Sequence, residues 1–111
     1  MESIEQICNE FKIKNYTINE DGIVDINGNV YLSNKGLSKI PLKFGEVTGD
    51  FSCAYNNLTS LENCPSIVGG DFFCNGNKLS EILNYPIIKG PDFIGGYFYI
   101  DSLYVENLDE S

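Results

Sequence analysis

Apolar and polar residues recur along the middle of the chain with a constant offset of 21 residues. Residues 49–61 match residues 70–82 at glycine, aspartate, phenylalanine, cysteine, asparagine and leucine positions. The same offset reaches residues 28–40 in one direction and residues 91–103 in the other, with a weaker match. A unit of this length cannot bury an apolar face by itself and must stack on its neighbours. The period therefore predicts a mostly β solenoid of 21-residue units.

Each unit is predicted to contain a short strand, a turn and an irregular return. In the second unit Phe51 and Cys53 alternate with Ser52 and Ala54, which places the first pair inward and the second pair outward. Asn56 follows at the turn. The return after it has no helical period, so we expect loop or short extended segments there.

The first 27 residues have a different pattern and predict a cap for the first unit. Residues 2–11 place four apolar side chains at helical spacing, and Ser3 can cap the start of that helix. Two alternating segments then flank Asp21-Gly22, a strong signal for a β-hairpin. The second strand of the hairpin is expected to continue through residues 27–28 into residues 30–32.

These patterns divide a single domain into four parts. Residues 1–27 form the N-terminal cap, residues 28–90 form three repeat units, residues 91–105 form a degenerate unit with a β-type C-terminal cap, and residues 106–111 form an acidic tail.

The charge of −9 is concentrated at the two ends of the chain. Residues 1–27 carry −4 and residues 90–111 carry −5, and all seven basic residues are lysines. Such a field repels nucleic acid, and arginine contacts to phosphate and guanine are lacking. No apolar run is long enough to cross a membrane, and the acidic start differs from a secretory signal. We therefore expect a cytoplasmic protein with no direct nucleic-acid or membrane partner.

Catalysis, cofactors and metals have little support in the sequence. There is no histidine, no Gly-x-Ser-x-Gly elbow and no Gly-x-x-x-x-Gly-Lys loop. The four cysteines lack zinc-ligand spacing, and Cys53 and Cys74 occupy the same position in successive units. We interpret these two cysteines as small buried hydrophobes in a protein that is not an enzyme.

The segments Phe51-x-Cys53-x-x-Asn56-x-Leu58 and Phe72-x-Cys74-x-x-Asn77-x-Leu79 resemble the leucine-rich repeat. The resemblance implies that Asn56 and Asn77 form a ladder whose amides satisfy backbone groups in the turns. Ser33-Asn34-Lys35-Gly36-Leu37 and the units that follow also look like repeat proteins encoded by bacteriophages and low-GC bacteria. That likeness implies a phage protein that inhibits a host factor, such as a component of a defence system, in the bacterial cytoplasm.

The outward strand positions are the predicted binding surface. Stacking the units puts Tyr31, Ser52, Phe73 and Ile94 in one column, which suggests a protein-contact patch. Asp50, Asp71 and Asp92 form a second column, either for a basic partner or for local bonds to backbone N–H groups.

The leading hypothesis is therefore a non-enzymatic protein-protein interaction module. One alternative is an acidic nucleic-acid mimic that occupies the basic groove of a DNA- or RNA-binding protein. Another is a self-assembling homo-oligomer, because both ends of a solenoid carry strands that can pair edge to edge.

Overall fold

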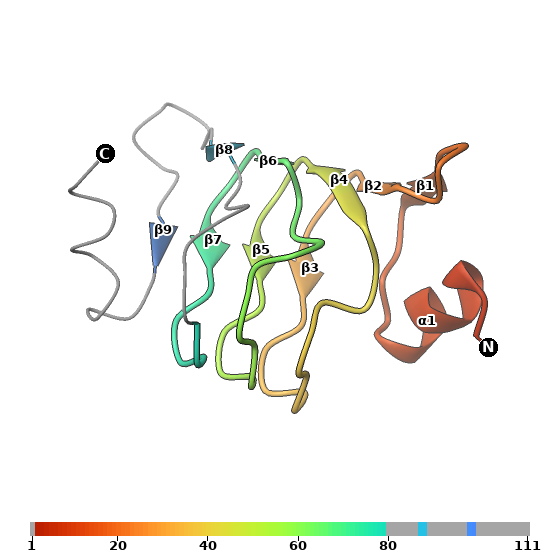
Figure 1. Ribbon diagram of the computed structural model, residues 1–111. Coiled ribbons are helices and arrows are strands. Elements are labelled where there is room, and N and C mark those ends of the chain that lie inside the picture. Colours follow the sequence, from red (N-terminus) through yellow and green to blue (C-terminus); the bar gives the residue numbers. More distant parts are fainter. Residues whose placement is uncertain (1, 80–86, 89–97, 100–111) are drawn as a thin grey trace.

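The computed structural model describes residues 2–79, 87–88 and 98–99, which are mostly β-sheet with one short helix (Figure 1). Helix α1 (Ile4–Glu10) begins at Ser3, whose hydroxyl accepts the Gln6 N–H while the Gln6 side chain accepts the Ser3 N–H. This capping box satisfies two of the free amides at the helix start. The predicted helix and its Ser3 cap are thus confirmed. Within the described ranges, no helix has the length and apolar character needed to span a membrane.

The strands of the described residues form two sheets, each with its strands side by side in chain order (Figure 1). The five-stranded sheet contains β1 (Tyr16–Ile18), β2 (Val24–Ile26), β4 (Phe44–Val47), β6 (Ile67–Val68) and β8 (Ile87–Ile88). The four-stranded sheet contains β3 (Val30–Tyr31), β5 (Phe51–Ser52), β7 (Phe72–Phe73) and β9 (Phe98–Tyr99).

Only the β1–β2 pair is antiparallel among the strand pairs of the described chain. The hairpin turns at Gly22, which has a φ of 78°, so the Asp-Gly signal is confirmed. From β2 onward the chain alternates between the two sheets. In the four-stranded sheet Val30 pairs with Phe51 and Phe51 pairs with Phe72, which is the 21-residue offset of the sequence.

The returns between units hold more structure than the sequence predicted. They contain β4, β6 and β8, which pair in parallel to extend the hairpin into a second sheet. The expectation that the hairpin strand continues from residue 27 into residues 30–32 was wrong. Gly28 has a φ of 148°, and the chain leaves the five-stranded sheet there to begin β3 in the other. Glycine adopts this backbone conformation without steric cost.

The register at the last strand also differs from the prediction. Phe73 pairs with Tyr99 and not with Ile94, an offset of 26 residues. Glycine is unfavourable in strands, and Gly95-Gly96 directly follow Ile94, whereas the aromatic residues 97–99 favour strand formation. Asp92, Ile94, most of the predicted C-terminal cap and the acidic tail lie outside the described residues.

The core lies between the two sheets and repeats with the units. Phe51 stacks on Phe72 with ring centroids 5.9 Å apart, and Phe44 meets Phe51 edge to face at 5.2 Å. Phe51 and Cys53 are fully buried, as their predicted inward positions require, and Leu58 is fully buried as well. Aromatic pairs of this kind stabilise beyond their buried area. The helix packs on the same core through Ile4, Ile7, Cys8 and Phe11.

Candidate functional site

The outward column of the four-stranded sheet contains two aromatic residues around a serine. Strand register places Tyr31 beside Ser52 and Ser52 beside Phe73. Tyr31 is 58% exposed and Phe73 is half-buried. Ser52 is only 7% exposed, so the prediction that it faces solvent was wrong. Its short side chain lies between two large ones, and its hydroxyl hydrogen-bonds to that of Ser33.

Tyr55 is an exposed aromatic residue that the sequence analysis missed. It lies in the turn after β5, is 58% exposed and has a φ of 57°. Its ring lies over Gly76, where an added Cβ would collide with it. A positive φ is strained for a bulky side chain, and strained residues often occur at functional sites. Alignment of the units could have identified Tyr55. The equivalent residues are Asn34 and Gly76, which tolerate a positive φ, whereas tyrosine does not.

A buried amide holds the turns after β3 and β5, the second of which carries Tyr55. Asn56 accepts the N–H groups of Lys35 and Leu37 at 2.9 and 3.0 Å. Its own amide donates to the carbonyl oxygens of Leu32, Cys53 and Ala54. The Asn56 side chain thereby links two successive units. Buried polar groups are stable only when they are paired in this way.

Asn77 repeats the arrangement of Asn56 one unit later. It accepts the N–H of Leu58 at 2.9 Å and donates to the carbonyl oxygens of Cys53 and Cys74. The structure therefore places both asparagines where the leucine-rich-repeat resemblance implies them.

Carboxylate and amide oxygens join neighbouring units on the outside of the molecule. Oδ1 of Asp25, Asn29 and Asp50 accepts the N–H of the residue 21 positions later, at 2.7–2.8 Å. Asp50 therefore has the local structural role that the sequence analysis gave as one of two alternatives. No group of three or more metal-ligating side chains is present in the part of the chain that the structure describes.

Each of these oxygen bonds requires a glycine. A Cβ at Gly45, Gly49 or Gly70 would collide with Oδ1 of the residue that accepts the bond. The recurring Gly-Asp pairs of the sequence thus have a joint explanation. The glycine leaves room for the oxygen of the preceding unit, and the following N–H donates to it.

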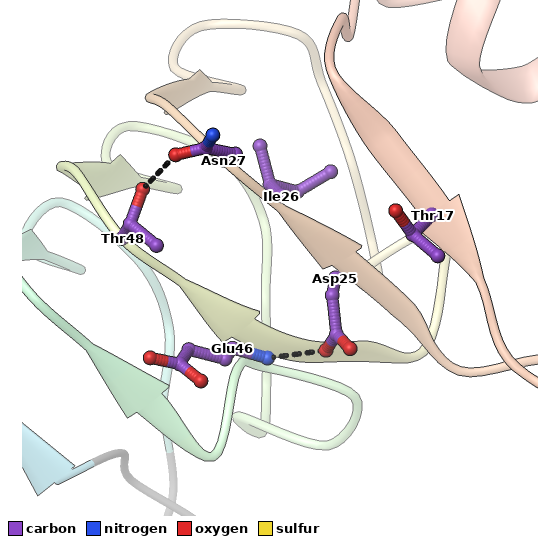
Figure 2. Close-up of a pocket in the computed structure, with 6 residues that line it drawn as sticks. All are labelled: Thr17, Asp25, Ile26, Asn27, Glu46 and Thr48. Carbon is purple, nitrogen blue, oxygen red and sulfur yellow. Dashed lines mark hydrogen bonds between the residues drawn. The ribbon is translucent and has the colours of Figure 1, made fainter.

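The outer face of the five-stranded sheet has a polar pocket of about 170 Å³ (Figure 2). Asp25 is one of its lining residues, and the Glu46 N–H and the Asn19 side chain donate to its two oxygens. The pKa of Asp25 is lowered, mainly by the Glu46 N–H and then by Asn19. Thr48 donates to Asn27 across the same pocket. The bonds of Asp25, Asn27 and Thr48 thus join neighbouring parts of the sheet at this pocket.

A second hollow of about 230 Å³ lies between the end of α1 and strand β3. Its lining includes two lysines and no carboxylate; the residues are Phe11, Lys12, Ile13, Asn29, Val30, Tyr31 and Lys35. The sequence carries no signal for this hollow, because its two walls are separated along the chain by the hairpin.

The cysteines are free and buried. Cys53 and Cys74 are 0% and 1% exposed, in the core positions where we expected small hydrophobes. A side-chain hydrogen bond with Cys53, together with burial, raises the pKa of Cys64 well above its ordinary value. Buried thiols of this kind are poor nucleophiles.

Comparisons with known proteins found no family model, no curated protein and no solved structure that matches the chain. The function proposed below therefore rests on the geometry of this chain and on the sequence resemblance.

Proposed function

We propose that the protein is a short leucine-rich-repeat-like solenoid that binds another protein and catalyses no reaction. The 21-residue pairing of β3, β5 and β7 supports the solenoid, as do the inter-unit bonds of Asn56 and Asn77. Repeat architectures of this kind offer extended surfaces for protein contact.

The observation that carries the proposal is the pair of exposed tyrosines on the side of the four-stranded sheet. Tyr31 and Tyr55 are each 58% exposed, and Tyr55 is held on strained backbone. Tyrosine is enriched at the centres of protein interfaces, where it buries a large area at low entropic cost. The Asn56 side chain fixes the turn next to Tyr55, so the ring is held in place before binding.

The partner that the sequence resemblance favours is a host bacterial protein, such as a defence component that binding would inhibit. That step is an analogy with phage-encoded repeat proteins, and it places the complex in the host cytoplasm.

Affinity capture with two variants tests the proposal. The immobilised wild type, a Tyr31→Ala/Tyr55→Ala double variant and a Thr17→Ala control are incubated with lysate of a low-GC bacterium at low and high salt. Thr17 is exposed on the other sheet. We expect one protein to be retained at both salts by the wild type and the control, and at least about tenfold less by the double variant.

The same experiment can contradict the proposal. Equal retention by all three proteins would exclude the tyrosines as the contact. Retention of DNA- or RNA-binding proteins at low salt only would favour the acidic mimic, because charge-dominated binding is screened by salt.

A further inference from the structure

The two sheets end differently on the side of α1. In the five-stranded sheet β2 is covered by the antiparallel β1, whereas β3 is the terminal strand of the four-stranded sheet (Figure 1). The N–H of Val30 donates to the carbonyl oxygen of Asp50, just before β5, and that of Leu32 donates to the carbonyl oxygen of Ser52 in β5, each at 2.8 Å. Successive residues of a strand direct their backbone groups to opposite edges. The N–H and carbonyl groups of Tyr31 and Ser33 therefore face the free edge.

The hollow of about 230 Å³ lies against this edge. Val30 and Tyr31 form one wall, and Phe11 and Ile13 form the other. An open strand edge next to an apolar recess is the arrangement used in β-augmentation, in which a peptide adds a strand to a sheet. In that mode backbone hydrogen bonds supply affinity and the recess selects a side chain.

The charge of the hollow specifies the chemistry of its occupant. Lys12 and Lys35 are exposed at its rim, and none of its lining residues is acidic. In a chain with a net charge of −9, this is a local positive site. A carboxylate between the two ammonium groups would be stabilised by both of them.

We propose that the free edge of β3 binds an extended peptide segment of the partner that carries a carboxylate. The peptide backbone pairs with Tyr31 and Ser33, and its carboxylate lies between Lys12 and Lys35. Tyr31 joins this edge to the exposed sheet face, so the inference rests on the proposed protein-binding function and names the part of the partner that is recognised.

The test is an NMR titration of the ¹⁵N-labelled protein with an end-blocked peptide, Thr-Val-Glu-Val-Thr. We expect the amide signals of Tyr31, Ser33 and Lys35 to shift, and the Tyr31 amide to become protected from hydrogen exchange. The same peptide with glutamine in place of glutamate should bind at least about fivefold more weakly. A Lys12→Ala/Lys35→Ala variant should lose most of this preference, whereas the control Lys39→Ala/Lys43→Ala should keep it. Both control lysines are exposed and lie outside the hollow.

Three outcomes would overturn the inference. In the first, millimolar peptide leaves the Tyr31 and Ser33 signals unchanged. In the second, the glutamine peptide binds as well as the glutamate peptide. In the third, the same amides become protected without peptide as the protein concentration rises, which would assign the edge to a second copy of this chain.

The two proposals fail separately. If the peptide does not bind β3 but lysate capture still depends on Tyr31 and Tyr55, the inference about the edge is wrong and the proposed function stands. If capture does not depend on the tyrosines, the proposed function is wrong whatever the peptide does.

Discussion

The two sheets connect the same consecutive units but differ in how they meet solvent. The five-stranded sheet ends near α1 in the antiparallel hairpin strand β1, and hydrogen bonds of Asp25 and Thr48 join neighbouring parts of its polar outer face. The four-stranded sheet leaves β3 at its edge and presents Tyr31 and Tyr55 to solvent, while Asn56 and Asn77 hold its turns from inside. Outer bonds from Asn29 and Asp50 also join successive strands of the four-stranded sheet, so the exposed tyrosines are what distinguish this side of the molecule.

The largest effect is expected from removing the interior amide that holds the turns after β3 and β5. Asn56→Ala would leave the N–H groups of Lys35 and Leu37 and several carbonyl oxygens without their partner. Each unpaired buried group costs about 1–3 kcal/mol, so we expect a loss of about 3 kcal/mol in the free energy of unfolding. Urea denaturation measures this loss.

The neighbouring Asn57→Ala is a matched control for Asn56→Ala. Its side chain is exposed, and the change should alter stability by less than about 0.5 kcal/mol. Equal effects of the two substitutions would show that the ladder contributes nothing to the four-stranded sheet.

The repeat made much of this sheet predictable. The inward positions of Phe51 and Cys53 follow from alternation and from the 21-residue offset, and the structure confirms them. The second sheet was not predictable in the same way, because β6 and β8 contain two residues each and show no alternation to detect. The shift to Tyr99 was missed because it depends on a competition between two nearby strand-prone segments.

The five-stranded sheet should respond to acid through Asp25. The pKa of Asp25 is lowered from its ordinary 3.8 by the N–H of Glu46 and then by Asn19. A lowered pKa in the folded state means that the carboxylate stabilises the protein at pH values above 3.8, and that this contribution is lost as the pH falls through the folded pKa. Asp25→Asn should therefore be less stable than wild type at neutral pH, and the difference should shrink as the pH falls through the lowered pKa of Asp25.

Urea midpoints of both proteins between about pH 7 and pH 2.5 test this expectation. Thr48→Val is the control, because it removes the neighbouring bond to Asn27 without removing a titrating group. Its difference from wild type should be the same across the range. A difference for Asp25→Asn that is also independent of pH would contradict the role assigned to the carboxylate.

The candidate site was less predictable than the fold, for two physical reasons. Ser52 obeys the alternation of its strand and yet is buried, because burial depends on the size of its neighbours Tyr31 and Phe73. Lys12 and Lys35 line the same hollow at β3, and only the tertiary arrangement brings the two segments that carry them together. Tyr55 was accessible to sequence reasoning only through its contrast with Asn34 and Gly76.

The smallest effect on stability, and the most informative about function, is expected from exchanging Tyr55 for the residue of the preceding unit. Tyr55 has a φ of 57° and Asn34, its equivalent, has a φ of 58°. Asparagine tolerates this conformation better, so Tyr55→Asn should stabilise the protein by about 0.5 kcal/mol. The loss of the packing between the Tyr55 ring and Gly76 should offset part of this gain. The reciprocal Asn34→Tyr should destabilise it by a similar amount.

If Tyr55 is retained for contact, Tyr55→Asn will fold more stably and capture less partner, whereas Asn34→Tyr will fold less stably and capture as much. A Tyr55→Asn variant that loses stability and keeps full capture would instead assign the ring a packing role against Gly76. Binding of the partner would then depend on Tyr31 and the β3 edge.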